Sequence, residues 1–429
     1  MKRNFGLMAT CLPLICAANE IPEPVIPAGV GVNIHFTVGH DKDLDLIAKA
    51  GFRLIRMDFG WAGIEREKGQ YRWSEYDELM SHLDGRGIRA VLILDYSNPL
   101  YEEQVTSINP LTHQSHQTTA SPQHPESVAA FARWAAASAK HFQGRHVLWE
   151  LWNEPNIDFW SPKPDVHQYT TLALAAAKAI READPQATII GPATSTFPWD
   201  FLETFLSSGI LQYLDGISVH PYREPRREPE TVASDYQKLR ELIERHAPSG
   251  KKGKIPILSG EWGYSSWQKG VSIQIQAAFL VRQQLVNLLH GVPLSIWYDW
   301  KNDGTDPNEN EHNFGTVEMD FNPKPAYAAV ETLTRELAGY SVGWRDPLES
   351  ERDYLLICTN SAGAQKLVAW TLAGPHLLNL ALGDDAQFVS GTLGTGDKIM
   401  LNKQRERWPL PLSAMPLYVS FRNPALKPR

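Results

Sequence analysis

Eight short apolar segments alternate with longer segments of helical period between Gly29 and about Gly339, and this alternation constrains the fold most. It is typical of βα units around a parallel sheet. Eight units in roughly 300 residues predict an α/β fold of the (β/α)8 (TIM) barrel type, and no glycine-rich dinucleotide turn follows the first segment. The predicted strands are residues 31–36, 54–59, 89–95, 147–152, 187–192, 216–220, 256–260 and 294–300.

The sequence changes character after Tyr340, where short strand-like runs are separated by Gly, Asn, Asp and Pro. We therefore expect a barrel over residues 29–340 and a small C-terminal β-sandwich domain over residues 341–429. The sandwich is either a carbohydrate-binding module or a cap packed on the barrel, and the cap is favoured because Trp370 and Trp408 alone do not mark a sugar platform.

The N-terminus has the pattern of a secretory signal peptide over residues 1–18, with Lys2 and Arg3 before an apolar stretch and small residues at its end. This predicts a periplasmic or secreted protein with no transmembrane segment after signal removal. An ordinary disordered terminus and a lipid anchor are the alternatives. Removal of the signal would leave Cys358 as the single cysteine, which excludes an internal disulfide.

Charge and composition narrow the possible partners. The chain has 41 Lys and Arg against 49 Asp and Glu, a net charge of -8 that disfavours nucleic acid as a partner. It also contains 14 Trp, whose large side chains need either a core or a ligand to cover them.

Polar residues gather at the ends of the predicted strands, with the parity expected to face the barrel axis. In such a barrel the active site lies at the C-terminal ends of the strands. The opposite parity, as in Ile55, Met57 and Phe59, is apolar. The polar strand ends are Asn33 and His35, Arg56 and Asp58, Glu150 to Glu154, Ser218 to Tyr222, Ser259 and Glu261, and Trp297 and Asp299.

Two carboxylates stand out among these residues. Glu154 lies in Trp149-Glu-Leu-Trp-Asn-Glu-Pro-Asn156 at the end of the fourth strand, and Glu261 lies in Ser259-Gly-Glu-Trp-Gly263 at the end of the seventh. Cleavage of a glycosidic bond needs such a pair, one carboxyl to protonate the leaving oxygen and one to attack or stabilise the oxocarbenium-like centre. A strand-end ion pair is the alternative for either glutamate alone.

Asn153-Glu154-Pro155, the glutamate ending strand seven and the His220-Pro-Tyr222 triplet resemble the clan A glycoside hydrolases, which are (β/α)8 retaining enzymes. With Gly260-Glu-Trp262 and a trailing sandwich, the chain most resembles glycoside hydrolase family 39. The resemblance implies that Glu154 is the general acid/base, that Glu261 is the nucleophile and that Asn153 binds the sugar 2-hydroxyl.

The neighbouring polar residues fit supporting roles. We expect Arg56 to orient Glu261 and lower its pKa, Tyr222 to hydrogen-bond the nucleophile and His220 to assist the acid/base. Glu150 is interpreted as a buried partner of an arginine. His35 is either a sugar contact or a satisfied core histidine.

Several tryptophans are predicted at or just after strand ends, where an indole face can stack on a pyranose ring. Trp297 is expected to form the floor of the reactive subsite, with core packing as the alternative. The expected sugar-stacking residues are Trp61, Trp160, Trp262, Trp267, Trp297 and Trp300.

No cofactor and no metal site is predicted. The acidic loop over residues 302–321 matches no calcium-loop spacing and is interpreted as a solvated rim. The segment over residues 97–123 is expected to shape the cleft.

The spread of the expected stacking residues over several loops favours an endo-acting enzyme. The resemblance to hydrolases encoded with exopolysaccharide assembly systems implies a retaining hydrolase of an exopolysaccharide of the biofilm-matrix type. The export machinery is then a possible partner. The alternatives are a plant-polymer hydrolase (xylanase, mannanase or β-xylosidase) and a non-catalytic sugar-binding barrel.

Overall fold

The computed structural model describes residues 21–108, 114–223 and 226–424, so the predicted signal peptide lies outside the described residues. Within that part, eight parallel strands form a closed barrel in the order β1-β10-β9-β8-β7-β6-β3-β2. The predicted (β/α)8 barrel is therefore confirmed. The barrel strands are β1 Val30–Asn33, β2 Leu54–Gly60, β3 Arg89–Asp95, β6 Leu148–Leu151, β7 Thr188–Ser195, β8 Gly216–His220, β9 Ile257–Trp262 and β10 Ser295–Trp297.

Helices surround the barrel, and most of them bury one apolar face against it, as helices of this period do. The exception is α8, which is buried at every position from Gln276 to Asn287. The described helices of eight residues or more are α1 Asp41–Ala50, α3 Ser74–Asp84, α4 Pro125–His141, α5 Val166–Ala183, α6 Trp199–Ser207, α7 Ala233–His246, α8 Ile273–Leu289 and α9 Pro325–Glu336. Asp165 caps α5 by accepting from the backbone N–H groups of His167 and Gln168, which satisfies two otherwise unpaired donors. Among the described helices, none is both long and apolar enough to cross a bilayer.

The barrel interior is apolar toward the N-terminal ends of the strands and polar toward their C-terminal ends. Its apolar layer is one buried cluster that Ile21 joins from the N-terminal segment; the other members are Leu54, Val91, Leu148, Ile190, Leu258, Leu294 and Ile296. Arg56, Glu150 and Gly260 lie two residues after Leu54, Leu148 and Leu258 on β2, β6 and β9. Since side chains alternate along a strand, residues on this parity face the axis and lead to the C-terminal mouth.

The C-terminal region is a six-stranded antiparallel sheet faced by a two-stranded one, which agrees with the predicted sandwich. The six strands, in sheet order, are β11 Tyr340–Arg345, β12 Asp353–Asn360, β13 Gln365–Thr371, β18 Leu417–Arg422, β15 Gln387–Leu393 and β16 Lys398–Ile399. The small sheet pairs β14 His376–Leu380 with β17 Trp408–Leu412.

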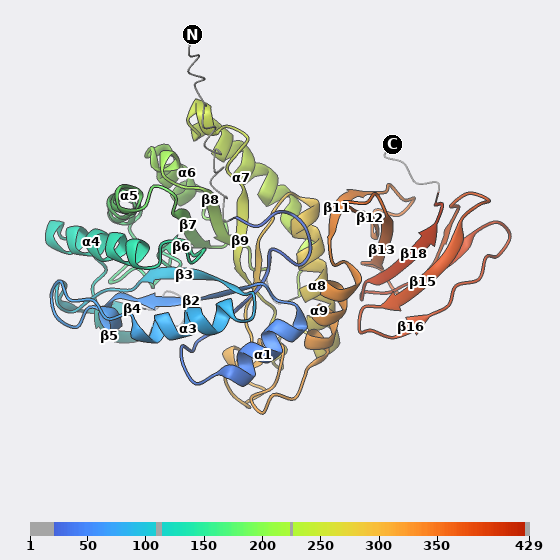
Figure 1. Cartoon of the computed structure of the whole chain (residues 1–429), viewed down its shortest axis with the longest axis horizontal. Helices are drawn as coiled ribbons and strands as arrows, with labels where there is room; N and C mark the ends of the chain where they lie inside the picture. Colours follow the sequence, from blue (N-terminus) through green and yellow to red (C-terminus); the bar gives the residue numbers. More distant parts are fainter. Residues whose placement is uncertain (1–20, 109–113, 224–225, 425–429) are drawn as a thin grey trace, which may run out of the picture.

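The sandwich packs against the barrel through α8 and α9, which lie between the two parts (Figure 1). Trp370 is fully buried and its indole N–H donates to Glu230 Oε1 over 2.7 Å. Trp408 is also buried, in the core between the two sheets. Neither indole therefore presents a face to a sugar, which supports the interpretation of this region as a cap.

The segment after β3 contains an element that the sequence analysis missed. It forms an antiparallel hairpin of β4 Gln104–Ile108 and β5 Ser115–Thr119, beside the ends of β2 and β3 in Figure 1. Both strands are polar and mostly exposed, so no apolar alternation marked them in the sequence.

Candidate active site

Arg56 occupies the centre of the barrel mouth, and its guanidinium is fully buried. Its Nε donates to Glu150 Oε2 over 2.6 Å, and its Nη1 donates to Glu261 Oε2 over 2.7 Å. Its Nη2 donates to Asn153 Oδ1 over 2.8 Å. A buried cation needs such partners to offset its desolvation. Arg56 thus joins the ends of β2, β6 and β9, and it is the arginine that the predicted pairing of Glu150 requires.

Glu154 lies just after β6, where the chain takes an unusual conformation. Trp152 has φ 70° and Glu154 has φ 44°, in the left-handed region that L-residues rarely adopt. The Glu154 N–H donates to the carbonyl of Ala193 over 3.0 Å, which holds this turn. Conformations of this kind cost about 1–3 kcal/mol each and cluster at functional sites.

His220 fixes which oxygen of Glu154 is free. Its Nε2 lies 3.2 Å from Nη2 of Arg56, which can only donate, so Nε2 is the acceptor and Nδ1 carries the proton. Nδ1 lies 2.9 Å from Glu154 Oε1 and therefore donates to it. The other oxygen, Oε2, is then the position for the proton that an acid catalyst would transfer.

Glu261 reaches the mouth because β9 contains a bulge. Ser259 pairs with Ser295 and Trp262 with Trp297, so β9 has one more residue than β10 over this stretch. Such an extra residue re-aims the side chains that follow it. Gly260 faces the axis, where a Cβ would lie 2.2 Å from Ser218 Oγ, and the bulge lets Glu261 point inward as well.

The surroundings of Glu261 favour its ionised form. Tyr222 donates from its hydroxyl to Oε1 over 2.7 Å, and Arg56 holds Oε2. Burial would raise the pKa of Glu261, but the charge of the Arg56 guanidinium and the hydrogen bond from the Tyr222 hydroxyl outweigh it and hold that pKa below its usual range. An ionised carboxylate suits a nucleophile.

The two carboxylates are close together. One ligand atom each of Glu154, His220 and Glu261 lie within 4.8 Å of one another. Asn153 lies beside them, with its Nδ2 donating to the Tyr96 hydroxyl over 2.9 Å. The structure therefore brings together Asn153, Glu154, Arg56, His220, Tyr222 and Glu261, as the sequence predicts.

The tryptophan predictions are wrong for three residues of the proposed sugar site. Trp262 and Trp297 are 0% exposed and Trp300 is 2% exposed. Trp297 belongs to the core cluster on the helix side of the barrel, whereas its neighbour Ile296 belongs to the interior cluster. The parity assigned to this strand was therefore inverted, and these indole faces pack in the core. Trp61 and Trp160 are likewise fully buried.

Smaller aromatic residues line the mouth instead. Tyr298 is half-buried and its ring packs edge-on against His35 at 5.8 Å. Burial and the nearby charge of Glu261 raise the pKa of its hydroxyl, so Tyr298 stays neutral beside the nucleophile. Sequence reasoning missed Tyr298 and Tyr96. The available signal was position, since Tyr96 directly follows the predicted strand 89–95 and Tyr298 lies in the second half of the predicted strand 294–300.

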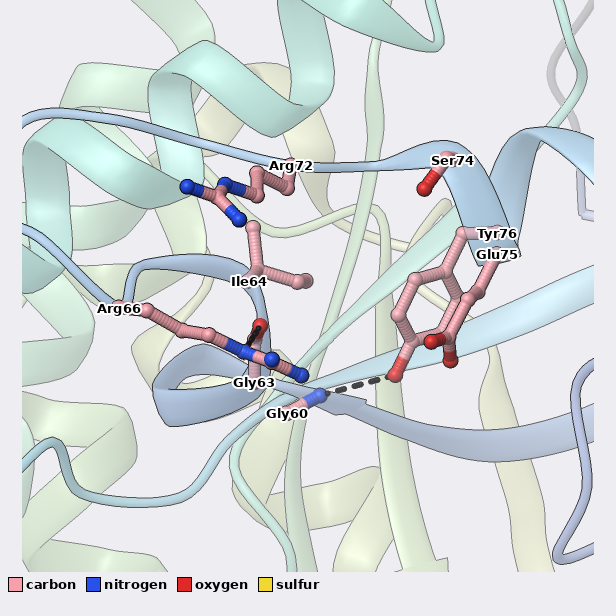
Figure 2. A pocket seen from close by; sticks show the side chains of 8 residues that line it. All are labelled: Gly60, Gly63, Ile64, Arg66, Arg72, Ser74, Glu75 and Tyr76. Carbon is pink, nitrogen blue, oxygen red and sulfur yellow. Dashed lines mark hydrogen bonds between the residues drawn. The ribbon is translucent and has the colours of Figure 1, made fainter.

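Three hollows lie beyond the C-terminal ends of barrel strands. One of about 200 Å³ is lined by Tyr96, Trp152 and Phe159, and one of about 190 Å³ by His35, Phe36 and Asp299. The third, of about 320 Å³, follows β2. Figure 2 shows Arg66 and Arg72 on one side of this hollow and Glu75 and Tyr76 on the other, with the Gly60 N–H donating to the Tyr76 hydroxyl over 3.2 Å.

His35 is 45% exposed on its cavity, which excludes its interpretation as a core histidine. Asp299, which lines the same cavity, is buried. Burial, together with the charges of Asp303 and Glu311, raises the pKa of Asp299 well above its usual range.

The chain is similar in sequence to known glycoside hydrolases. The sequence profile of the family described as cellulase (glycosyl hydrolase family 5) matches residues 25–303. A β-xylosidase of Caldicellulosiruptor saccharolyticus is 27% identical over 209 residues, which are 44% of this chain and 41% of that protein. The chain thus spans less than half the length of that curated relative.

Solved structures share the fold. A family 39 glycoside hydrolase from Bacteroides cellulosilyticus WH2 superposes with a TM-score of 0.79 at 24% identity, over 94% of this chain and 82% of that one. A monomeric β-xylosidase from Caulobacter crescentus CB15 superposes with a TM-score of 0.66 at 17% identity, over 96% of this chain and 98% of that one. The similarity to family 39 that the sequence indicates therefore extends to the architecture of both parts.

Proposed function

The chain belongs to the family described as cellulase (glycosyl hydrolase family 5), and from this premise we propose that it is a retaining glycoside hydrolase. Glu154 is the general acid/base and Glu261 the nucleophile. The observation that carries the proposal is the separation of their carboxylates, with ligand atoms within 4.8 Å. Retaining enzymes hold this pair about 5–5.5 Å apart, whereas inverting enzymes need about 6.5–9.5 Å to admit a water.

The reaction follows from the contacts of the two groups. Glu154 transfers the proton on Oε2 to the leaving oxygen while ionised Glu261 attacks the anomeric carbon, which gives a covalent glycosyl-enzyme. Glu154, now ionised, then takes a proton from water as the water displaces Glu261. Asn153 is held by Arg56 and Tyr96, and its amide is the group we assign to the 2-hydroxyl of the sugar.

The substrate we propose is a bacterial exopolysaccharide cleaved internally. Hollows on several sides of the mouth, lined by Tyr96 and Phe159, by Phe36 and His35, and by residues after β2, give room for a chain of sugars. Aromatic faces and hydrogen-bonding side chains are the groups that recognise saccharides. A periplasmic or secreted location, supported by the signal-like residues 1–18, would place the enzyme with such a polymer and with its export machinery.

The second candidate is a plant-polymer hydrolase. It is favoured by the β-xylosidases among the relatives and among the similar structures. The two differ in the sugar accepted and in the products: an endo-acting enzyme releases oligosaccharides, whereas a β-xylosidase releases single xylose units.

A substrate panel tests these alternatives. Bacterial exopolysaccharides, xylan, mannan and xylo-oligosaccharides are incubated with the wild type, with Glu154→Gln and with Glu261→Gln, and products are identified by mass spectrometry. We expect oligosaccharide products from an exopolysaccharide and none from the Glu261→Gln protein. Release of xylose alone, from xylo-oligosaccharides alone, would favour the second candidate. Cleavage that survives in both variants would exclude this site as the catalyst.

A further inference from the structure

Three side chains at the rim of the mouth converge on one point outside the catalytic pair. His35 follows β1, while Asp299 and Asp303 follow β10, and one ligand atom of each lies within 4.8 Å of the others. All three line the cavity of about 190 Å³ beside Trp300 and Lys301. His35 and Asp303 are exposed, and Asp299 is 2% exposed.

The direction of the hydrogen bonds leaves His35 with an acceptor atom toward Asp299. Arg56 Nη1 donates to Asn33 Oδ1 over 3.2 Å, so the amide nitrogen of Asn33 is the atom facing His35. This nitrogen lies 3.3 Å from His35 Nε2, which therefore accepts and leaves the ring proton on Nδ1. Nε2 in turn lies 3.8 Å from Asp299 Oδ2, which is too far for a hydrogen bond between these two atoms.

One carboxyl oxygen of Asp299 lacks a hydrogen-bond partner in the described part of the chain. Its Oδ1 is buried and has no hydrogen-bond partner among the described residues. An unpaired buried carboxylate oxygen is costly, and native proteins satisfy such groups with a donor or a cation.

The nearby protein cations are engaged elsewhere. Lys301 Nζ donates to Asp43 Oδ1 over 2.8 Å. Lys324 Nζ donates to Ser266, Asn302 and Asn313. The carboxyl of Glu311 adds further negative charge to the same region, since its Oε2 lies 3.4 Å from the Tyr298 hydroxyl. The cavity is therefore lined by the hydrogen-bond acceptors of His35, Asp299 and Asp303, and neither nearby lysine donates a hydrogen bond to them.

We propose that His35, Asp299 and Asp303 form a binding site for a divalent transition-metal ion. An imidazole nitrogen with two carboxylates suits first-row ions such as Mn²⁺ and Zn²⁺ better than Mg²⁺ or Ca²⁺, which prefer oxygen ligands alone. The ion takes the Nε2 lone pair in place of the long contact with Asn33, and water fills its positions toward the cavity. Asp299 Oδ1 then has a bound ion or a metal-bound water as its partner.

Direct metal titration of the whole protein tests the site. The chain is stripped with a chelator and titrated with MnCl2, followed by the electron paramagnetic resonance of free Mn²⁺, and with ZnCl2 by calorimetry. We expect one ion per chain, Zn²⁺ bound more tightly than Mn²⁺, and Ca²⁺ or Mg²⁺ weaker than either. Asp303→Asn and His35→Gln should each weaken binding by about tenfold or more.

Glu309→Gln is the matched control, because Glu309 is an exposed carboxylate of the same loop and outside the three-residue cluster. The Glu309→Gln protein should bind Mn²⁺ and Zn²⁺ with the same dissociation constants as the wild type. The proposal is overturned if neither ion binds below about 1 mM, or if both cluster variants bind as the wild type does. A second result would also overturn the proposal. The metal-free protein would bind an oligosaccharide, Asp303→Asn would abolish that binding, and no ion would bind to either protein. The acceptors of the cluster would then be hydrogen-bond partners of sugar hydroxyls.

Discussion

A ligand atom of Glu154 and one of Glu261 lie within 4.8 Å of each other, although two barrel strands, β7 and β8, stand between β6 and β9. Two local departures from regular structure produce this proximity. The left-handed turn at Trp152 and Glu154 directs one carboxylate inward, and the bulge in β9 directs the other. Arg56 lies beneath them and holds Glu261 and Asn153 in fixed positions.

Removal of Glu154 should separate acid catalysis from nucleophilic attack. In Glu154→Ala, we expect cleavage of natural glycosidic bonds to fall by about 10²–10⁴-fold, because the leaving oxygen is no longer protonated. Aryl glycosides with an acidic phenol should lose less, and azide should restore turnover by attacking the glycosyl-enzyme. Steady-state rates with both substrate types measure this. If Glu154→Ala and Glu261→Ala both keep wild-type rates, the barrel only binds sugar.

Tyr222→Phe should change the pH profile. The Tyr222 hydroxyl is one of the groups that lower the pKa of Glu261, so its loss should raise that pKa. Because the nucleophile must be ionised, the acidic limb of kcat/KM should move to higher pH when this hydrogen bond to the carboxylate is lost. Tyr264→Phe, a buried tyrosine that donates instead to the carbonyl of Arg227, is the control and should leave the limb in place.

Substitution of Trp297 should mainly lower stability, whereas substitution of Tyr298 should mainly weaken substrate binding. Trp297→Ala empties a fully buried site and should destabilise the protein by about 3–5 kcal/mol. Tyr298→Ala removes a half-buried ring at the mouth and should raise KM by about tenfold with a smaller effect on stability. Thermal melting and saturation kinetics on the two variants make the comparison. A larger KM effect for Trp297→Ala, with unchanged melting temperature, would contradict the buried position.

Glu336 should couple the stability of the sandwich to pH. Its carboxylate accepts from Lys398 over 2.9 Å, from Lys366 over 3.1 Å and from Thr392 over 3.0 Å, and so joins α9 to β13, β15 and β16. Burial opposes ionisation, but these contacts lower the pKa of Glu336 to about 2. Its stabilisation is therefore present above about pH 4.5 and is lost as the pH falls toward about 2.

Glu336→Gln should accordingly lower the free energy of unfolding by about 1 kcal/mol at neutral pH. The difference in melting temperature from the wild type should shrink as the pH falls below about 4.5. Glu331→Gln, on the same helix, is the control. A difference that persists at pH 2, or that grows on acidification, would assign the role of Glu336 to packing rather than charge.

The sequence predicts the barrel and the polar centre because both follow from simple periodicity. Strand parity places Arg56, Glu150, Ser218 and His220 correctly, since β2, β6 and β8 carry polar residues on one side only. It fails on β10, where Ser295-Ile-Trp-Tyr-Asp-Trp300 offers large apolar groups on both parities. Glu261 was assigned to the mouth together with Ser259, because the two residues are two positions apart. The bulge between them makes their side chains face opposite sides of the strand, and no periodic pattern reveals a bulge.

The surplus of tryptophan also has a different explanation from the one the sequence indicates. Most of the predicted stacking residues are core, and the exposed aromatic surface at the mouth comes from residues such as Tyr298 and Phe159. Burial depends on which face the helices cover, and composition carries no information about that.

The stereochemistry of the first product tests the central claim most directly. Hydrolysis is followed by proton NMR from the first minutes, before mutarotation mixes the anomers, on a substrate identified by the panel. Two successive displacements at one carbon predict that the new reducing end has the anomeric configuration of the bond that was cleaved. Initial appearance of the opposite anomer would show a single displacement by water and would contradict the assignment of Glu261 as nucleophile.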